Sequence, residues 1–136
     1  MKLITYTDGG SRGNPGPAAL GVVIKNAHGE TIEAFGTYIG HTTNNQAEYQ
    51  ALVAAMETAT KLGATEVACF LDSELIVKQM KREYRVRDLA LQTHYLKIYN
   101  MAQKIGHVTF THVPREKNKE ADAEVNKALD AHARAR

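Results

Sequence analysis

The stretch Lys2-Leu3-Ile4-Thr5-Tyr6-Thr7-Asp8-Gly9-Gly10-Ser11 begins as a β-strand and changes character at its acid. Its first residues are rich in β-branched and aromatic side chains, which favour a strand. Asp8-Gly9-Gly10 then predicts a glycine turn that ends the strand and leaves the carboxylate at its tip. We also expect the two glycines to let the backbone approach a ligand closely, through unusual dihedral angles. The alternative is that Asp8 is an ordinary turn aspartate.

The pattern downstream of this stretch predicts an α/β domain built around one sheet. Two strands flank a turn at His28-Gly29, which indicates a hairpin. The period then changes to that of a helix, and Gly63 caps its end. The order of strands and helices indicates a mixed sheet with an antiparallel edge and parallel crossovers. The expected strands span residues 2–7, 20–25, 31–39, 66–71 and 107–112, the expected helices 44–62, 73–82, 88–105 and 120–133, and the expected loops 11–17 and 114–119.

Composition places the chain among ordinary globular proteins. Its 136 residues, 43% of them hydrophobic, suit one compact domain over residues 1–136. A net charge of +2 permits nucleic-acid binding without indicating it. Cys69 is the only cysteine and lies in an apolar run, so we expect a buried core residue and neither a disulfide framework nor a thiolate metal site. With no leader and no apolar run of about 18 residues, a soluble cytoplasmic protein without a membrane part is expected.

Acidic residues stand where predicted strands end or helices begin, at Asp8, Glu48, Asp72 and Asp122. Acids placed in this way can converge at one end of a sheet, where close packing would make them repel one another and raise their pKa values. Mg²⁺ prefers such oxygen ligands and is held by a few carboxylates together with substrate phosphate oxygens. A pair of ions can activate water and stabilise the leaving oxygen. The pattern therefore predicts metal-dependent cutting of a phosphodiester backbone.

Each of the other acids also has an alternative role as part of a helix start. Glu48 can close a capping box with Asn45 as the N-cap. Asp72 can be an N-cap itself, and Asp122 a favourable acid in a first helical turn. These alternatives leave the run Thr42-Thr43-Asn44-Asn45-Gln46 unexplained, because it gathers hydrogen-bonding groups at a helix N-terminus, which favours anions such as phosphate.

A histidine and two groups of basic residues extend the predicted site. His112 ends the fifth expected strand, where it can shuttle protons or be a solvated loop residue. The other histidines show no metal-ligand spacing. The basic residues after Asp72 form either a solvated helix face or a ridge that contacts phosphates. The two basic groups are Lys78, Lys81, Arg82, Arg85 and Arg87 in the first, and Arg115, Lys117 and Lys119 in the second.

Several motifs follow one another in order along nearly the whole chain. They are Tyr6-Thr7-Asp8-Gly9-Gly10-Ser11, Gly13-Asn14-Pro15-Gly16-Pro17, Thr42-Thr43-Asn44-Asn45-Gln46-Ala47-Glu48, Asp72-Ser73 and Ala121-Asp122. Together they resemble type 1 ribonuclease H. The resemblance implies a five-stranded mixed sheet in the order 3-2-1-4-5, flanked by helices. It also implies endonucleolytic hydrolysis of the RNA strand of an RNA–DNA hybrid, which leaves 3′-hydroxyl and 5′-phosphate ends.

The same resemblance implies roles for individual residues. Two Mg²⁺ or Mn²⁺ ions would be held by Asp8, Glu48, Asp72 and Asp122, and His112 would assist turnover. Thr43 would contact a DNA phosphate, and Glu48 would also accept from a 2′-hydroxyl, the group that distinguishes RNA from DNA. The expected partner is an RNA–DNA hybrid bound by a monomer. Contacts with 2′-hydroxyls and base edges in the minor groove would fall on Gly10, Ser11, Asn14, Asn44, Asn45 and Gln46.

The sequence departs from the family pattern in two places. Residues 78–91 look too short for the basic, tryptophan-bearing protrusion with which some members grip the hybrid, and the chain has no tryptophan. Affinity for the hybrid is then expected to be weaker or to depend on Arg85 and Arg87. Glu124 stands where the family usually has an apolar residue, so it either disturbs the packing of the last helix or adds charge near the site.

Other functions of the same fold remain open at this point. A transposase- or integrase-like nuclease would share the acids, although the short chain and the Asn44-Asn45-Gln46 run argue against it. A hybrid-binding module without activity is the non-enzymatic alternative, and the intact set of acids argues against that one.

Overall fold

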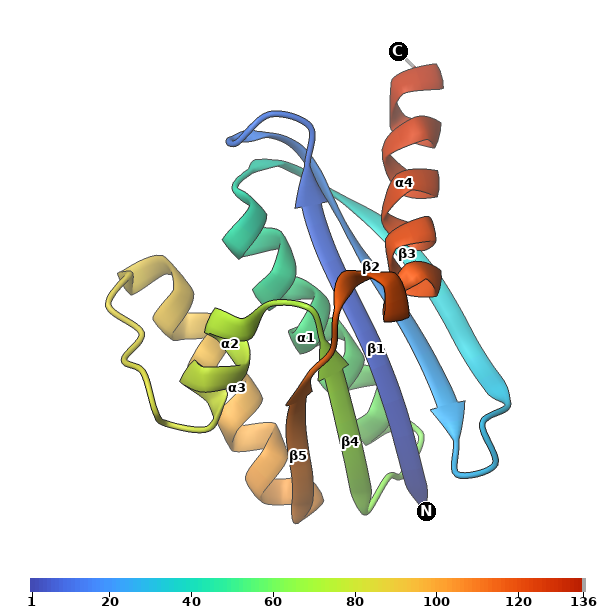
Figure 1. The fold of residues 1–136 in the computed structure, drawn as a ribbon, viewed down its shortest axis with the longest axis vertical. Helices are drawn as coiled ribbons and strands as arrows, with labels where there is room; N and C mark the ends of the chain where they lie inside the picture. The colour runs from blue at the N-terminus through green and yellow to red at the C-terminus, as the bar shows by residue number, and fades with distance from the viewer. Residues whose placement is uncertain (136) are drawn as a thin grey trace.

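The five strands form one sheet in the order β3-β2-β1-β4-β5, as Figure 1 shows. The coordinates are a computed structural model that describes residues 1–135. β1 pairs antiparallel with β2 and parallel with β4, and β4 pairs parallel with β5. This confirms the predicted mixed sheet and its order. The strands are β1 (Lys2–Ser11), β2 (Gly16–Asn26), β3 (Thr31–Thr42), β4 (Glu66–Leu71) and β5 (His107–His112).

Helices cover both faces of the sheet. On β2, Leu20 and Val22 belong to the main core with α1 and α3, whereas Ala19 packs against α4 on the other face. This follows from the alternation of side chains along a strand. Figure 1 shows α4 on the opposite side of the sheet from α1. The helices are α1 (Asn44–Lys61), α2 (Glu74–Met80), α3 (Leu89–Ile105) and α4 (Lys119–Arg134), with a 3₁₀ turn at Arg115–Lys117.

The helix starts are fixed by side chains that cap them. The hydroxyl of Thr43 accepts from the backbone N–H of Gln46 at the start of α1, and the hydroxyl of Ser73 accepts from the N–H of Ile76 at the start of α2. Such caps satisfy N–H groups that have no partner inside the helix. Gly63, with a φ of 81°, follows the end of α1, as its position in the sequence predicts.

The first strand is longer than the sequence predicts. β1 continues through Asp8, Gly9 and Gly10 to Ser11, and β2 already begins at Gly16, so the connecting loop covers only residues 12–15. The predicted glycine turn after Thr7 is therefore wrong, and the predicted loop over residues 11–17 is present but shorter. Neither Gly9 nor Gly10 has a positive φ. Pairing with β2 carries the strand past the acid, since Asp8 pairs with Gly21 in the ladder.

Gly9 has a packing role. A Cβ atom on Gly9 would lie 2.2 Å from the backbone carbon of Ala47 in α1. Real Cβ atoms essentially never come so close, so any larger residue would push α1 away from the sheet. The absence of a side chain at Gly9 makes room for the backbone of α1. The sequence had instead predicted that this glycine makes room for a ligand. Within residues 1–135, no helix has both the length and the apolar character needed to cross a membrane.

Candidate active site

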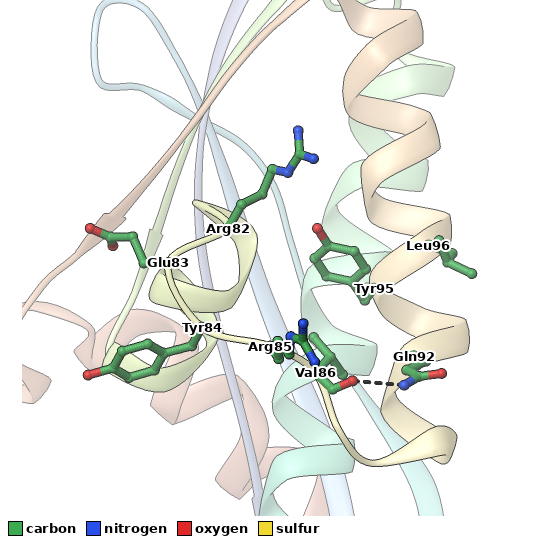
Figure 2. A pocket seen from close by; sticks show the side chains of 8 residues that line it. All are labelled: Arg82, Glu83, Tyr84, Arg85, Val86, Gln92, Tyr95 and Leu96. Carbon is green, nitrogen blue, oxygen red and sulfur yellow. Dashed lines mark hydrogen bonds between the residues drawn. The ribbon is translucent and has the colours of Figure 1, made fainter.

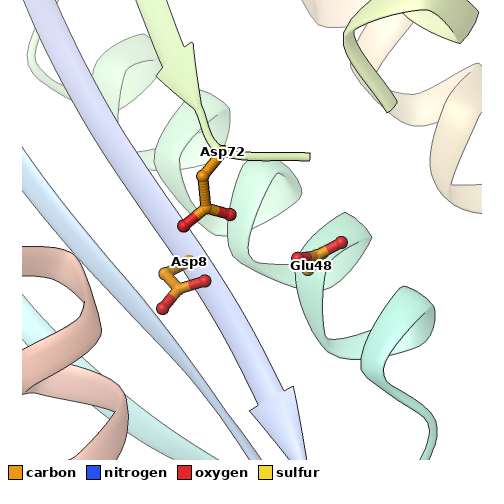
Figure 3. A group of neighbouring side chains, drawn as sticks. All are labelled: Asp8, Glu48 and Asp72. Atoms are coloured by element: carbon orange, nitrogen blue, oxygen red, sulfur yellow. The ribbon is translucent and has the colours of Figure 1, made fainter. Parts of the chain in front are cut away.

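Three of the predicted acids meet beside the sheet. Asp8, Glu48 and Asp72 each offer a carboxylate oxygen, and these oxygens lie within 4.8 Å of one another. Figure 3 shows them projecting towards a common point from β1, α1 and the segment after β4. Asp8 is only 8% exposed, whereas the other two are half-buried. The oxygens are therefore close enough to share one cation.

Sheet register and helix packing produce this meeting. Thr7 and Leu71 are partners on the parallel strands β1 and β4, so Asp8 and Asp72 are the next residue on each chain. Parallel strands bring their carboxyl ends to the same edge. Glu48 arrives from the other direction, because Gly9 lets the backbone of α1 rest directly on β1.

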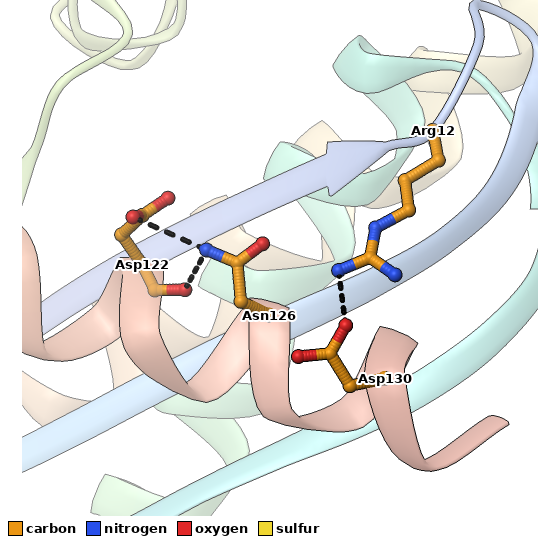
Figure 4. Close-up of polar contacts among 4 residues, drawn as sticks. All are labelled: Arg12, Asp122, Asn126 and Asp130. Atoms are coloured by element: carbon orange, nitrogen blue, oxygen red, sulfur yellow. Dashed lines mark hydrogen bonds and ion pairs between the residues drawn. The ribbon is translucent and has the colours of Figure 1, made fainter. Parts of the chain in front are cut away.

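Asp122 approaches Asp8 from the opposite face. A Cβ atom on Gly21, the partner of Asp8 in the ladder, would lie 2.2 Å from the carbonyl oxygen of Ala121, so this glycine admits the start of α4. Asn126 donates from Nδ2 to the Asp122 carboxylate at 3.3 Å and to its carbonyl oxygen at 3.2 Å, as Figure 4 shows. Asp122 lies outside the three-acid cluster but lines the same cleft.

The electrostatics of the site reflect this crowding. Burial and the neighbouring Asp72, Asp122 and Glu48 carboxylates together raise the pKa of Asp8 to about 8, and burial has the largest effect. Burial and Asp72 likewise raise the pKa of Glu48 to about 7, although Ser73 and Arg115 act in the opposite direction. Two acids that prefer to be protonated near neutral pH form a site that a cation would stabilise.

The capping alternatives fail for two of the acids. Thr43 is the N-cap of α1, which places Glu48 beyond the position that a capping box requires. Ser73 is the N-cap of α2, so Asp72 is free of that role. Asp122 does lie in the first turn of α4, where an acid is favourable. Asp122 therefore both stabilises the start of α4 and lines the cleft.

All four acids line one cleft of about 550 Å³ together with several polar residues. Arg115, from the 3₁₀ turn, contributes a guanidinium, and Gly10, Ser11, Asn44 and Asn45 form the part of the wall beyond the acids. Asn44 is held in place by Ser11, whose N–H and hydroxyl both donate to Asn44 Oδ1 at 2.9 Å. The structure therefore groups four of the residues expected to contact the hybrid beside the acids.

The other expected contact residues lie around this wall. Asn14 accepts from the backbone N–H of Asn44 at 3.1 Å and so supports it from the β1–β2 loop. Thr43 caps α1. Gln46 turns towards α3, where its Oε1 lies 3.0 Å from Nε2 of His94, and it does not line the cleft. His112 ends β5 as an exposed residue. The nearby Glu74 has a lowered pKa, chiefly because of Lys78 and to a smaller extent because of His112.

Asn118 is a residue of the site that the sequence did not reveal. It lies just before α4 and is 1% exposed. Its Nδ2 donates to the carbonyl oxygen of Thr7 at 2.8 Å and to Oδ2 of Asp72 at 3.3 Å. An asparagine in a charged loop gives no periodic signal of burial, so only its position four residues before Asp122 could have drawn attention to it.

The two departures from the family pattern have structural outcomes. Glu124 does not line the cleft; its carboxylate lies 3.4 Å from Nζ of Lys127, and its carbonyl oxygen rests over Gly36 of β3. It thus neither adds charge at the acids nor interrupts α4. Residues 81–88 form a short loop between α2 and α3 instead of a longer protrusion. A hollow of about 540 Å³ lies beside this loop. Arg82, Arg85 and Tyr95 are among its lining residues, which Figure 2 shows.

The sheet order and the carboxylates gathered at its edge define the ribonuclease H-like class of folds. Comparison with known proteins narrows this class. Residues 6–128 match the family described as "Reverse transcriptase-like". The chain is 42% identical over 129 residues to ribonuclease HI of Halobacterium salinarum, covering 95% of this chain and 65% of that protein. A bifunctional protein of Mycobacterium tuberculosis is 42% identical over 98% of this chain, which spans only 37% of that protein.

Solved structures agree with the sequence comparison. The crystal structure of RNase H1 from Halobacterium salinarum superposes with a TM-score of 0.93 at 40% identity, covering 96% of this chain and 99% of the other. LC11-RNase H1, solved in complex with an RNA/DNA hybrid, gives a TM-score of 0.92 at 45% identity, with 96% and 99% covered. The chain belongs to the type 1 ribonuclease H family, which confirms the resemblance.

Proposed function

We propose that this chain is an endoribonuclease that hydrolyses the RNA strand of RNA–DNA hybrids and leaves 3′-hydroxyl and 5′-phosphate ends. The observation that carries the proposal is the convergence of Asp8, Glu48 and Asp72 in one cleft that Asp122 also lines. The crystal structure of a relative, 45% identical, in complex with an RNA/DNA hybrid supports the choice of substrate. The domain over residues 1–136 would act as a monomer.

The carboxylates would hold two divalent ions, Mg²⁺ or Mn²⁺. Oxygen donors suit these hard cations. The fit rests on the chemistry of this site: burial and the neighbouring carboxylates raise the pKa values of Asp8 and Glu48, and the Arg115 guanidinium offsets only part of this rise at Glu48. When bound, such ions lower the pKa of water and stabilise the charge that develops on oxygens in phosphoryl transfer.

The side chains around the acids would orient the reacting groups. Glu48 would accept a hydrogen bond from a 2′-hydroxyl. Because DNA lacks this hydroxyl, the contact would link the choice of the RNA strand to metal binding. His112, exposed at the end of β5, would take or give a proton during hydrolysis and product release. Arg115 would offer its charge to a phosphate at the edge of the cleft.

Recognition of the RNA strand would take place on the wall beyond the acids. Ser11, Asn44 and Asn45 present hydroxyl and amide groups there, and Gly10, which also lines the cleft, would let a ribose approach its backbone. Asn14 and Gln46 stand further out, and Gln46 would have to reach the minor groove from its place beside His94. Thr43 would contact a phosphate of the DNA strand at the N-terminus of α1.

A second region would hold the duplex at a distance from the acids. Arg82 and Arg85 line the hollow between the 81–88 loop and α3, together with Tyr84 and Tyr95 (Figure 2). Cationic and aromatic side chains around one hollow are suited to binding a nucleic-acid strand. This loop, with Arg87 at its exposed end, would replace the longer tryptophan-bearing protrusion of other members.

The test is cleavage of a labelled RNA–DNA hybrid with Mg²⁺, alongside duplex DNA and duplex RNA. We expect cuts only in the RNA strand of the hybrid, lost on addition of EDTA and in Asp8→Asn. Glu57→Gln, which removes an exposed acid from α1 away from the cleft, serves as the control and should keep full activity. Processing of DNA ends would instead identify a transposase-like nuclease. Tight binding of the hybrid without any cut would identify an inactive binding module.

A further inference from the structure

Asn118 connects three of the segments that carry the acids. Its side-chain amide donates to the carbonyl oxygen of Thr7, which precedes Asp8, and to a carboxylate oxygen of Asp72. Its backbone carbonyl accepts from the N–H of Asp122 at 3.1 Å. One residue thus touches the end of β4, the middle of β1 and the first turn of α4. None of these contacts is needed for the sheet to pair, because the β1–β4 ladder already ends at Thr7 and Leu71.

The alternative is that Asn118 serves only as the N-cap of α4. Asparagine is a favoured N-cap because its Oδ1 accepts from an N–H in the first helical turn. Asn118 occupies the N-cap position of α4 but makes no such bond, and its Oδ1 is buried without a partner among residues 1–135. A buried acceptor without a partner is unfavourable. The orientation of the amide therefore favours the donor contacts with Thr7 and Asp72 over the capping of its own helix.

The chemistry of the amide fits this orientation. Only a donor can face both a carbonyl oxygen and a carboxylate oxygen, so an aspartate at position 118 would place like charges together. A donor on one oxygen of Asp72 fixes the plane of that carboxylate and leaves the rest of its lone pairs for a cation. Residues that hold metal-binding carboxylates in this way affect metal affinity and activity without touching the metal.

We propose that Asn118 is a positioning residue that orients Asp72 for divalent-cation binding and ties this orientation to the placement of β1 and α4. The inference rests on the proposed function, since it concerns the same carboxylates. It predicts that the loss of the amide weakens metal binding and turnover while leaving the contacts with the hybrid unchanged.

The experiment measures Mn²⁺ binding by calorimetry in the wild-type protein and in Asn118→Ala, without substrate. We expect the variant to bind Mn²⁺ on the order of 10- to 100-fold more weakly. In cleavage assays it should need correspondingly more Mg²⁺ for half-maximal rate, while KM for the hybrid changes by less than about twofold. Ile98→Ala, which removes a fully buried side chain of α3, is the control for a general loss of stability. It should lower the melting temperature without changing Mn²⁺ affinity.

Several outcomes would count against the proposal. Mn²⁺ affinity in Asn118→Ala that equals that of the wild type would overturn the inference while leaving the proposed function intact. A wild-type protein that neither binds Mn²⁺ nor cuts hybrid would overturn the proposed function together with the inference. If Asn118→Ala does not fold, Asn118→Ser is measured instead; its shorter side chain loses the reach of the amide, so it should also bind Mn²⁺ more weakly, and wild-type affinity would overturn the inference. Failure of both variants to fold would assign Asn118 to the scaffold alone and overturn the inference.

Discussion

Asp8 and Asp72 stand directly beyond Thr7 and Leu71, which are register partners on adjacent parallel strands. Each therefore offers an oxygen within 4.8 Å of the other, although 64 residues separate them in the sequence. Strand pairing fixes this proximity, so it does not depend on the side chains finding each other. The backbone holds the two carboxylates close together, where their negative charges repel. The protein must therefore either keep one of them protonated or bind a cation between them.

Replacing Asp72 by Asn should remove most of the turnover and leave the fold intact. Asp72 does not cap α2, since Ser73 does. Its charge raises the pKa values of Asp8 and Glu48, so its loss relieves repulsion in the metal-free protein. We expect a fall in hybrid cleavage of at least about 10³-fold, in the range found for groups that stabilise transition-state charge. The melting temperature in EDTA should stay unchanged or rise. A large fall in melting temperature would instead assign Asp72 a structural role.

The stability of the metal-free protein should decrease as the pH rises towards 8. The pKa of Asp8 is raised to about 8 and that of Glu48 to about 7, so the folded state holds protons that the unfolded chain releases near pH 4. Such groups stabilise the fold below the unfolded pKa, and this contribution is lost as the pH rises through the folded pKa. One pKa unit corresponds to about 1.4 kcal/mol, and screening reduces the total.

Urea unfolding in EDTA at pH 5 and pH 8 measures this loss, which we expect to reach at least about 2 kcal/mol. Addition of Mg²⁺ should restore stability more at pH 8 than at pH 5, because the ion competes with protons for the same oxygens. In Asp8→Asn the dependence on pH should shrink. If the stability of the metal-free wild type increased over this range, the acids would not be crowded in solution.

His112→Ala should slow turnover without abolishing it. The side chain is exposed at the end of β5, where solvent can replace part of its proton transfer. We expect kcat for the hybrid to fall by roughly 10- to 100-fold, at or below the lower end of the usual contribution of general acid–base groups. His107→Ala, at the exposed start of the same strand, is the matched control. Equal rates in the wild type and His112→Ala would make His112 a bystander.

Arg85→Ala should weaken binding of the hybrid and leave the chemical step alone. The side chain lines the hollow beside the 81–88 loop and not the cleft that holds the acids. We expect KM to rise about 3- to 10-fold, with kcat unchanged, and the salt dependence of binding to become shallower as a phosphate contact is lost. Lys61→Ala, an exposed basic residue at the end of α1, is the control. A variant that matches the wild type at all salt concentrations would exclude this loop from the grip on the duplex.

The pattern of the sequence predicted a mixed sheet and the meeting of the acids beside it, whereas the strand order came from the resemblance to type 1 ribonuclease H. It could not show why Glu48 comes so near Asp8. That closeness depends on Gly9. The sequence predicts a turn at this glycine, but in the structure its missing side chain lets the backbone of α1 pack directly against β1. Gly21 has the same role for α4 and gave no signal, since a glycine within a strand is ambiguous.

The polar contacts around the acids were harder to foresee. The orientation of Asn118 towards Asp72 depends on how the chain between β5 and α4 folds back over β1, which no local pattern encodes. The turn of Gln46 towards His94 likewise requires the packing of α1 against α3. The extent of the catalytic domain, the monomeric state, the roles of the individual residues and the cytoplasmic location remain predictions.

The proposed function requires that carboxylates distant in the sequence bind divalent ions together. Crystals soaked in Mn²⁺ and measured at the manganese absorption edge test it directly. We expect anomalous density for two ions between Asp8, Glu48, Asp72 and Asp122, bound through carboxylate oxygens at about 2.0–2.3 Å. Both peaks should be lost in Asp8→Asn or fall to a fraction of their wild-type height. A wild-type cleft without any anomalous density at saturating Mn²⁺ would show that these carboxylates do not bind divalent ions.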